Sequence, residues 1–308
     1  MLALSCSLIF SHHVVYNNFF QTEVSVFAQE FPTSEESSNS NKLSGINQSL
    51  LEDFRNVVKN QISIIFSEMF LQINERYVNE AIGLQIDFPN GWQGTEIKPA
   101  NALIISPPEI NVTGYLASAT EQGFYSFISS IEPRNDISTQ QIFQTAMSSI
   151  LNEALGSLEQ LDPIISVSPM NKDSVKSLQN HSGIAPPTES LASIWYEYTF
   201  SALNQMAGNL SEVKNSIGGN KIMSINYSEI NGFPAEISVS ESILPESNKS
   251  YKTLSYLFLT QDNIVAVEYS AGEENYEAYL PEFENSIRGI QVSNAIPINE
   301  ENIRRFIG

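Results

Sequence analysis

Residues 77–92 read Tyr-Val-Asn-Glu-Ala-Ile-Gly-Leu-Gln-Ile-Asp-Phe-Pro-Asn-Gly-Trp and contain the strongest fold signal in the chain. Leu84, Ile86 and Phe88 alternate with polar residues. This alternation predicts a strand with one buried face and one wet face. Gly83 precedes the strand and permits a turn from the residues before it.

The same stretch also contains a clear end for that strand. Pro89 has no N–H to donate to a ladder, and Asn90-Gly91 readily adopts positive φ, so a turn is expected here. Trp92 follows the turn and is expected to fold back onto the apolar face of the strand. The stretch therefore predicts how the chain packs, but it does not indicate a catalytic or binding activity.

The composition is that of a folded globular protein with a large acidic excess. The chain has 308 residues, of which 42% are hydrophobic, enough to bury one large core. It carries 35 acidic and 15 basic side chains, for a formal net charge of −20. Such a charge repels phosphate backbones, so we expect no nucleic-acid partner and interpret the charge as a source of solubility.

The N-terminal segment is expected to be an export signal followed by a linker. An apolar run over residues 2–10 and the small residue Ala28 predict a signal peptide over residues 1–28. Residues 29–46 hold few apolar side chains and are expected to be disordered. The only cysteine is Cys6, so the mature chain is expected to form no disulfide. We expect a secreted or cell-surface protein without a transmembrane span in its mature chain.

Glycosylation sequons agree with export but support it weakly, because an Asn- and Ser-rich chain produces them by chance. A glycoprotein remains an open expectation. The chain contains six Asn-x-Ser/Thr sequons, at Asn47, Asn111, Asn180, Asn209, Asn226 and Asn248.

Residues 47–295 have the pattern of one mixed α and β domain. Apolar residues at helical spacing predict helices at 47–74, 138–158, 188–217 and 274–288. Apolar runs predict strands at 84–88, 102–106, 124–131, 164–168, 222–229, 235–243, 251–260 and 264–270. Short turns separate the last four strands, which indicates an antiparallel meander. Pro281 predicts a kink or a break in the last helix near Leu280, and residues 296–308 are assigned to a C-terminal tail.

Three sets of residues carry a family resemblance. They are Tyr77-x-Asn79 with Gly83, Ile86, Phe88-Pro89 and Trp92; Asn231-Gly232-Phe233-Pro234-Ala235; and Tyr276-x-x-Tyr279-Leu280-Pro281-x-Phe283 with Ile287. Over roughly residues 76–292 the chain resembles the PsbP-like, Mog1-like superfamily. The resemblance implies an α+β fold, arranged as an α/β/α sandwich around a central, mainly antiparallel sheet. The long helix at 188–219 departs from the family pattern and is interpreted as an insertion. The resemblance also implies an extracytoplasmic, non-catalytic protein, and it accounts for Pro281, because the final helix of the family commonly carries Leu-Pro there.

Side chains for catalysis or metal binding are scarce. Nitrogen or sulfur ligation of a metal needs several His or Cys, and only His181 remains after the signal segment. No nucleophile elbow, phosphate loop, dinucleotide fingerprint, zinc-protease helix or EF-hand loop is present. Trp195 and Tyr198 lie at helical spacing and are interpreted as core residues rather than a ligand-stacking surface.

The remaining candidates for chemistry are carboxylates. Attraction to the positive end of a helix explains the densest cluster better than catalysis or calcium binding. That cluster comprises Glu273, Glu274 and Glu277. The sequence therefore predicts no catalytic, cofactor-binding or metal-ligating residues and no cofactor.

We therefore expect an exported, non-catalytic binding or accessory protein of the cell surface, whose partner is an unidentified protein or small molecule. A structural cell-surface component and a carboxylate-based extracellular hydrolase are the alternatives. A contiguous exposed apolar patch would favour binding, whereas a deep pocket with two converging acidic side chains would favour hydrolysis.

Overall fold

The computed structural model describes residues 69–130, 149, 153, 160–176, 190–207, 221–244 and 249–308. The expected signal peptide (1–28) and linker (29–46) lie outside these residues, as does His181. The helix expected at 138–158 also lies outside them, apart from residues 149 and 153. The described residues carry the β-rich domain and the helices that pack on it.

Two antiparallel sheets form the centre of the described part of the chain. The large sheet has eight strands in the order β1-β4-β5-β6-β10-β9-β8-β7, and every neighbouring pair is antiparallel. Its strands are β1 (Phe70–Asn74), β4 (Gln93–Ile97), β5 (Ala102–Ser106), β6 (Ile164–Asn171), β7 (Lys221–Ile230), β8 (Phe233–Leu244), β9 (Lys249–Leu259) and β10 (Asn263–Gly272). The small sheet has the order β11-β3-β2, with strands β2 (Arg76–Asn79), β3 (Leu84–Asp87) and β11 (Gln291–Val292).

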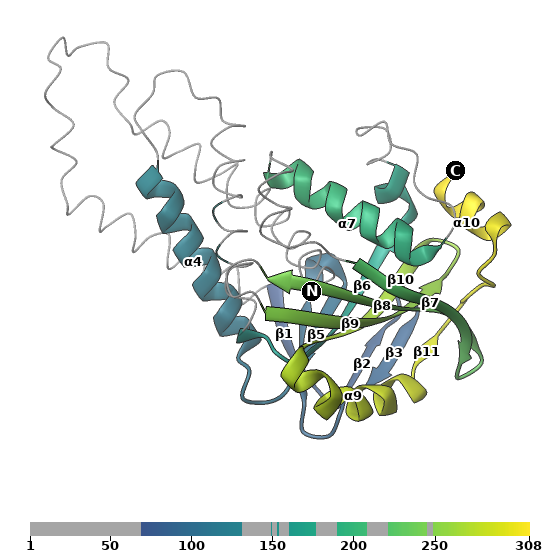
Figure 1. The fold of residues 1–308 in the computed structure, drawn as a ribbon, viewed down its shortest axis with the longest axis horizontal. Helices are drawn as coiled ribbons and strands as arrows, with labels where there is room; N and C mark the ends of the chain where they lie inside the picture. The colour runs from purple at the N-terminus through teal and green to yellow at the C-terminus, as the bar shows by residue number, and fades with distance from the viewer. Residues whose placement is uncertain are drawn as a thin grey trace, which may run out of the picture.

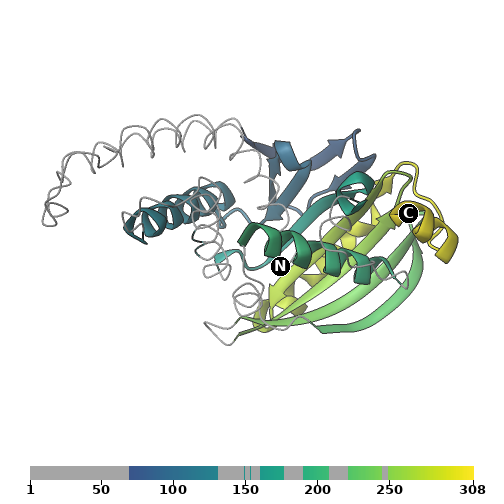
Figure 2. The same ribbon diagram turned by 90° about the horizontal axis from the view of Figure 1, so that it is seen from above.

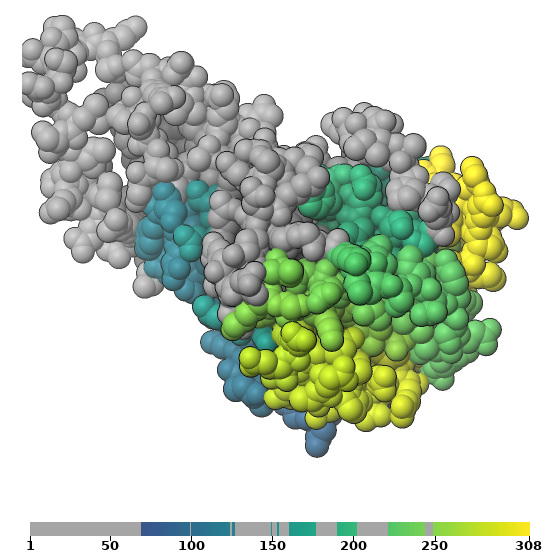
Figure 3. Space-filling model, viewed as in Figure 1, coloured from purple at the N-terminus to yellow at the C-terminus, as the bar shows by residue number. Residues whose placement is uncertain are grey.

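Helices pack against both faces of the large sheet (Figure 1). The helices include α4 (Val112–Ser130), α7 (Leu191–Ala207), α9 (Glu273–Arg288) and α10 (Glu300–Ile307), with a further helical segment at residues 172–176 and a 3₁₀ turn at Lys98–Ala100. In Figure 2, α7 lies over one face of the sheet. α9 and α10 form separate regions of the surface in Figure 3. Among the described residues, none of these helices is both long and apolar enough to span a bilayer.

Strand alternation divides the apolar residues between two cores. Val265, Val267 and Tyr269 of β10 point to the core that the small sheet and α9 share. Ile264 and Ala266 of the same strand point to the core that α7 and α10 share. Because β10 is covered on both faces, its sequence is nearly continuously apolar rather than alternating.

Residues 77–92 fold largely as their sequence pattern predicts. β3 covers most of the expected strand, and Leu84 and Ile86 are buried in the core below the small sheet. The N–H of Trp92 donates to the carbonyl of Pro89 at 3.0 Å, which closes the turn, and Gly91 has φ +80°. The Trp92 ring is buried and lies edge-on to Tyr279 of α9 at 5.9 Å between centroids.

The sequence prediction of a helix up to Asn74 is wrong at its C-terminal end. Residues 70–74 form β1, whose register with β4 runs from Phe70 opposite Ile97 to Asn74 opposite Gln93. Only Met69 is helical among the described residues that precede the strand. Pairing with β4 and burial of Phe70 outweigh the local helical periodicity here.

The prediction of a strand at Phe124–Ile131 is also wrong, since α4 occupies this region up to Ser130. Asn111 initiates the helix: its Oδ1 accepts from the N–H of Gly114 at 2.9 Å, and its carbonyl accepts from the N–H of Tyr115 at 2.9 Å. The apolar run that suggests a strand lies in the second half of α4, which begins at Val112 in the segment that the sequence predicts as a loop.

The helix predicted at 188–217 is present as α7 over Leu191–Ala207, and residues 208–217 lie outside the described part. Trp195 and Tyr198 are buried in the core that α7 shares with α10, as expected.

The final helix α9 is continuous through Pro281, so of the kink or break expected near Leu280 the break does not occur. Proline removes the hydrogen bond to the carbonyl four residues earlier, here that of Glu277. Pro281 and Glu277 are both exposed, so this side of the helix faces solvent, where water can replace a lost hydrogen bond. Tyr276, Phe283 and Ile287 are buried on the opposite side.

The segment assigned to a C-terminal tail, residues 296–308, contains α10. Asn299 caps this helix by accepting from the N–H of Asn302 at 2.9 Å. Ile303, Phe306 and Ile307 are buried, so this segment contributes to the core beside α7.

Candidate ligand-binding site

No site residue is predicted from the sequence, and the carboxylate cluster considered there lies at the start of α9. Glu273 and Glu274 form the first turn of the helix, and Glu277 is exposed one turn later. Within the described ranges, no three His, Cys, Asp or Glu side chains come together as a metal site would require. The cluster fits attraction to a helix N-terminus.

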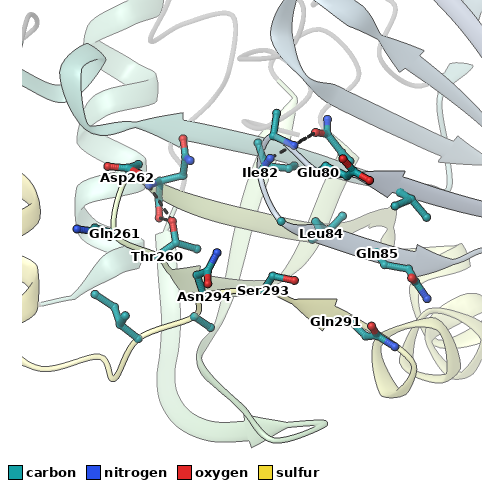
Figure 4. A pocket seen from close by; sticks show the side chains of 17 residues that line it. Glu80, Ile82, Leu84, Gln85, Thr260, Gln261, Asp262, Gln291, Ser293 and Asn294 are labelled. Carbon is teal, nitrogen blue, oxygen red and sulfur yellow. Dashed lines mark hydrogen bonds between the residues drawn. The ribbon is translucent and has the colours of Figure 1, made fainter.

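A cavity of about 570 Å³ opens where the two sheets meet (Figure 4). Residues 78–85, from the end of β2 to β3, form one wall. Residues 260–263, between β9 and β10, form the opposite wall. Residues 291 and 293–296, at and after β11, complete the lining. Three segments that are far apart in the sequence therefore build one concave surface.

The β2–β3 wall is held by Asn79, which is 8% exposed. Its Oδ1 accepts from the N–H groups of Ala81 at 3.0 Å and Ile82 at 3.3 Å. Its Nδ2 donates to the Tyr77 hydroxyl at 2.6 Å. Burial is the main cause that raises the pKa of Tyr77, so its hydroxyl stays protonated and can donate in turn to Glu96. The Tyr77-x-Asn79 signature thus fixes the turn that forms the wall.

Gly83 joins this wall to the residues after β11. Its carbonyl accepts from the N–H of Ser293 at 2.6 Å, and its φ is +67°. A Cβ on Gly83 would lie 2.9 Å from the Ser293 carbonyl oxygen. Both the left-handed conformation and the close approach require glycine at this position.

The opposite wall is a tight turn that its own backbone and Thr260 stabilise. The N–H of Thr260 donates to the Asn263 carbonyl at 2.8 Å, and the Thr260 Oγ1 accepts from the N–H of Asn263 at 2.9 Å. The Asp262 carbonyl accepts from the N–H of Lys172 at 2.9 Å. Because the turn uses no side chain of Gln261 or Asp262, both are free to face the cavity.

The lining combines carboxamides, hydroxyls, aliphatic groups and two carboxylates. Two exposed carboxylates, Glu80 and Asp262, come from opposite walls. No lining residue is a Lys, Arg, His or aromatic residue. The six carboxamide residues are Asn79, Gln85, Gln261, Asn263, Gln291 and Asn294. Such a surface can donate and accept hydrogen bonds, and it contains no paired nucleophile and base.

A second polar region lies inside the protein, between α7 and the large sheet. Glu236 of β8 is 0% exposed, and its two carboxylate oxygens accept from the N–H groups of Leu191 at 2.9 Å and Ala192 at 2.7 Å. Ser190 Oγ accepts from the N–H of Ser193 at 3.0 Å. The first turn of α7 is therefore capped by a side chain of the sheet and by its own N-cap.

Burial raises the pKa of Glu236, and its hydrogen bonds to Ala192, Leu191 and the Tyr227 hydroxyl offset only part of this rise. The sheet surface beside it carries small hydroxyl side chains in cross-strand pairs. Ser255 Oγ donates to Glu268 Oε1 at 2.8 Å, and Thr253 and Ser270 share a hydrogen bond of 2.9 Å. This region anchors α7 to the sheet.

No protein-family model matches the chain, and no curated protein sequence matches it. Among solved structures, it is similar to cyanobacterial PsbP (CyanoP) from Synechocystis sp. PCC 6803, with 10% identity and a TM-score of 0.36 over 73% of this chain and 92% of that chain. It is also similar to PA94, a protein of unknown function from Pseudomonas aeruginosa, with 9% identity and a TM-score of 0.26 over 41% of this chain and 70% of that chain. Both likenesses are too distant to support a statement about activity or partners.

Proposed function

We propose that this chain is an exported, non-catalytic binding or accessory protein of the cell surface, and that the cavity between the β2–β3 and β9–β10 turns is its ligand site. We further propose a PsbP-like α/β/α sandwich in which the helix that includes α7 is an insertion. The sequence signatures support the fold assignment, and the N-terminal apolar segment supports export. The observation that carries the binding role is the cavity itself.

The composition of the cavity supports binding rather than hydrolysis. A carboxylate-based hydrolase needs one carboxyl group that stays protonated, which usually requires burial in an apolar environment. Glu80 and Asp262 are both exposed and lie on opposite walls. Carboxamides dominate the polar lining, and they hydrogen-bond without entering acid–base chemistry. The lining also lacks a basic group, so anionic ligands are disfavoured.

A ligand screen with a blocked cavity tests the binding role. The full chain is screened by thermal melting against neutral and cationic small molecules, and each hit is repeated on Gln291→Trp, which adds a large side chain at an exposed lining position of β11. Met223→Trp, at an exposed position of β7 outside the cavity, is the matched control. Hits should disappear in Gln291→Trp and persist in Met223→Trp. Hits that survive in both variants would place the ligand site elsewhere.

A further inference from the structure

We propose that the cavity binds a linear aliphatic amine through its two carboxylates and its aliphatic surface. This inference rests on the proposed binding role of the cavity and adds the chemical class of the ligand. The proposed ligand carries a positive charge at each end and a methylene chain between the two charges.

The charge of the lining selects for a cation. Glu80 lies in the turn after β2 and Asp262 in the turn after β9, and the labelled side chains in Figure 4 flank the cavity from its two sides. Neither carboxylate forms an ion pair with another residue in the part of the chain that the structure describes. With no Lys, Arg or His in the lining, these two charges are uncompensated within the cavity. The net charge of −20 adds a long-range attraction for cations.

The apolar part of the lining selects for a methylene chain. Val78 is 57% exposed, Ala81 is exposed, and Ala295 and Ile296 are partly buried, so the β2–β3 wall and the segment after β11 both contribute aliphatic surface to the lining. No aromatic side chain lines the cavity, which removes the stacking surface that flat or cyclic ligands generally use. A flexible alkyl chain packs on an aliphatic surface and needs no aromatic ring.

The carboxamides complete the recognition of an amine. An ammonium group has three N–H donors and no acceptor, so it needs several acceptor oxygens around it. Gln261 and Asn263 flank Asp262 in the sequence, and the side-chain oxygens of both residues can accept. On the other wall, Gln85 lies in the strand that follows Glu80.

Calorimetric titration of the full chain with 1,5-diaminopentane tests the inference. The neutral 1,5-pentanediol and the anionic glutarate have the same chain length and serve as comparison ligands. We expect the diamine to bind at least tenfold more tightly than the diol, and glutarate not to bind. Glu80→Gln and Asp262→Asn should each weaken diamine binding about threefold, because exposed ion pairs are individually weak. The double variant should weaken it about tenfold.

Glu277→Gln with Glu282→Gln is the matched control, since it removes the same charge from exposed positions of α9. If this control weakens binding as much as the cavity variants, the diamine binds the acidic surface diffusely and the inference is overturned. Equal affinity for diamine and diol would refute the amine class while leaving the cavity as a binding site. Failure of the diamine to bind would also refute the amine class. The assignment of the cavity as the ligand site fails only if the blocked-cavity variant retains every hit of the screen.

Discussion

Replacement of Glu236 tests how the sheet anchors α7. Its carboxylate is 0% exposed and accepts from two main-chain N–H groups at 2.9 and 2.7 Å. Glu236→Ala leaves both donors without a partner inside the protein. An unsatisfied buried donor costs roughly 1–3 kcal/mol, so we expect the free energy of unfolding to fall by about 3 kcal/mol. Glu236→Gln keeps one acceptor oxygen and should cost about 1 kcal/mol at pH 7.

The difference in unfolding free energy between the wild type and Glu236→Gln should depend on pH with a definite sign. Burial raises the folded-state pKa of Glu236 above its ordinary value of 4.5. The folded protein therefore holds this proton more tightly than the unfolded chain does. The resulting stabilisation is fully present below the unfolded pKa and is lost as the pH rises through the folded pKa. The wild type should lose stability relative to Glu236→Gln as the pH rises above 4.5 and through the raised folded-state pKa of Glu236.

Urea unfolding followed by circular dichroism at several pH values measures both effects. Glu229→Gln removes the same charge from an exposed position of β7 and should change the stability by less than about 0.5 kcal/mol. If the wild type instead gains stability over Glu236→Gln as the pH rises, attraction between the carboxylate and the α7 amides outweighs burial. The folded-state pKa would then be lowered, and the reasoning would be wrong.

Four further predictions concern the core, a close contact, calcium and export. Phe306→Ala in α10 should lower the free energy of unfolding by about 3 kcal/mol, whereas a loosely attached tail would tolerate it without change. Gly94→Ala places a Cβ 2.6 Å from a neighbouring aromatic ring and should cost about 2–3 kcal/mol in urea unfolding. Gly91→Ala meets no atom within 4 Å and should cost only about 1 kcal/mol for its positive φ; equal costs would contradict the packing argument. Thermal melting should be the same with and without a calcium chelator, and a clear shift would show a calcium site. Intact-mass analysis of the protein from its host should find a secreted form that begins at Gln29, and a cytoplasmic form that retains Met1 would exclude export.

Much of the sheet was predictable because its strands have clear local patterns and stops. The period-two pattern ending at Pro89, and the Asn231-Gly232 turn with positive φ at both residues, predict their strands within one or two positions. The run at Phe124–Ile131 fails as a predictor because a short apolar run has no distinctive period. The helix that contains this run is capped by Asn111. The capping residue, which signals the start of a helix, is therefore separated in the sequence from the apolar run.

The polar residues of β8 show a different failure. Glu236, Ser238 and Ser240 alternate with Ala235, Ile237 and Val239, which is the pattern of a strand with a wet face, and Ser242 continues the polar face beyond Glu241. All four are buried in the structure, and α7 packs on the same side. A sequence pattern distinguishes the two faces of a strand but does not show whether a helix later covers the polar one.

The cavity was not predictable for a related reason. Its walls come from residues 78–85 and 260–263 and its remaining lining from residues near 293, so no local pattern contains it. The Tyr77-x-Asn79 signature indicates a structured turn, and only the fold shows what that turn faces.

The large sheet ends at β7, and this end is relevant to how the protein behaves at high concentration. Among the described strands β7 pairs with β8 alone, and its Met223 and Tyr227 side chains are 53% and 58% exposed. A long, regular edge strand with exposed apolar residues is a template for aggregation. The β-bulge between Ile222 and Ser224 interrupts that regularity, and Lys221 places a charge at the start of the strand. Deleting the bulged residue would straighten the edge, so such a variant should form sheet-rich aggregates that the wild type avoids.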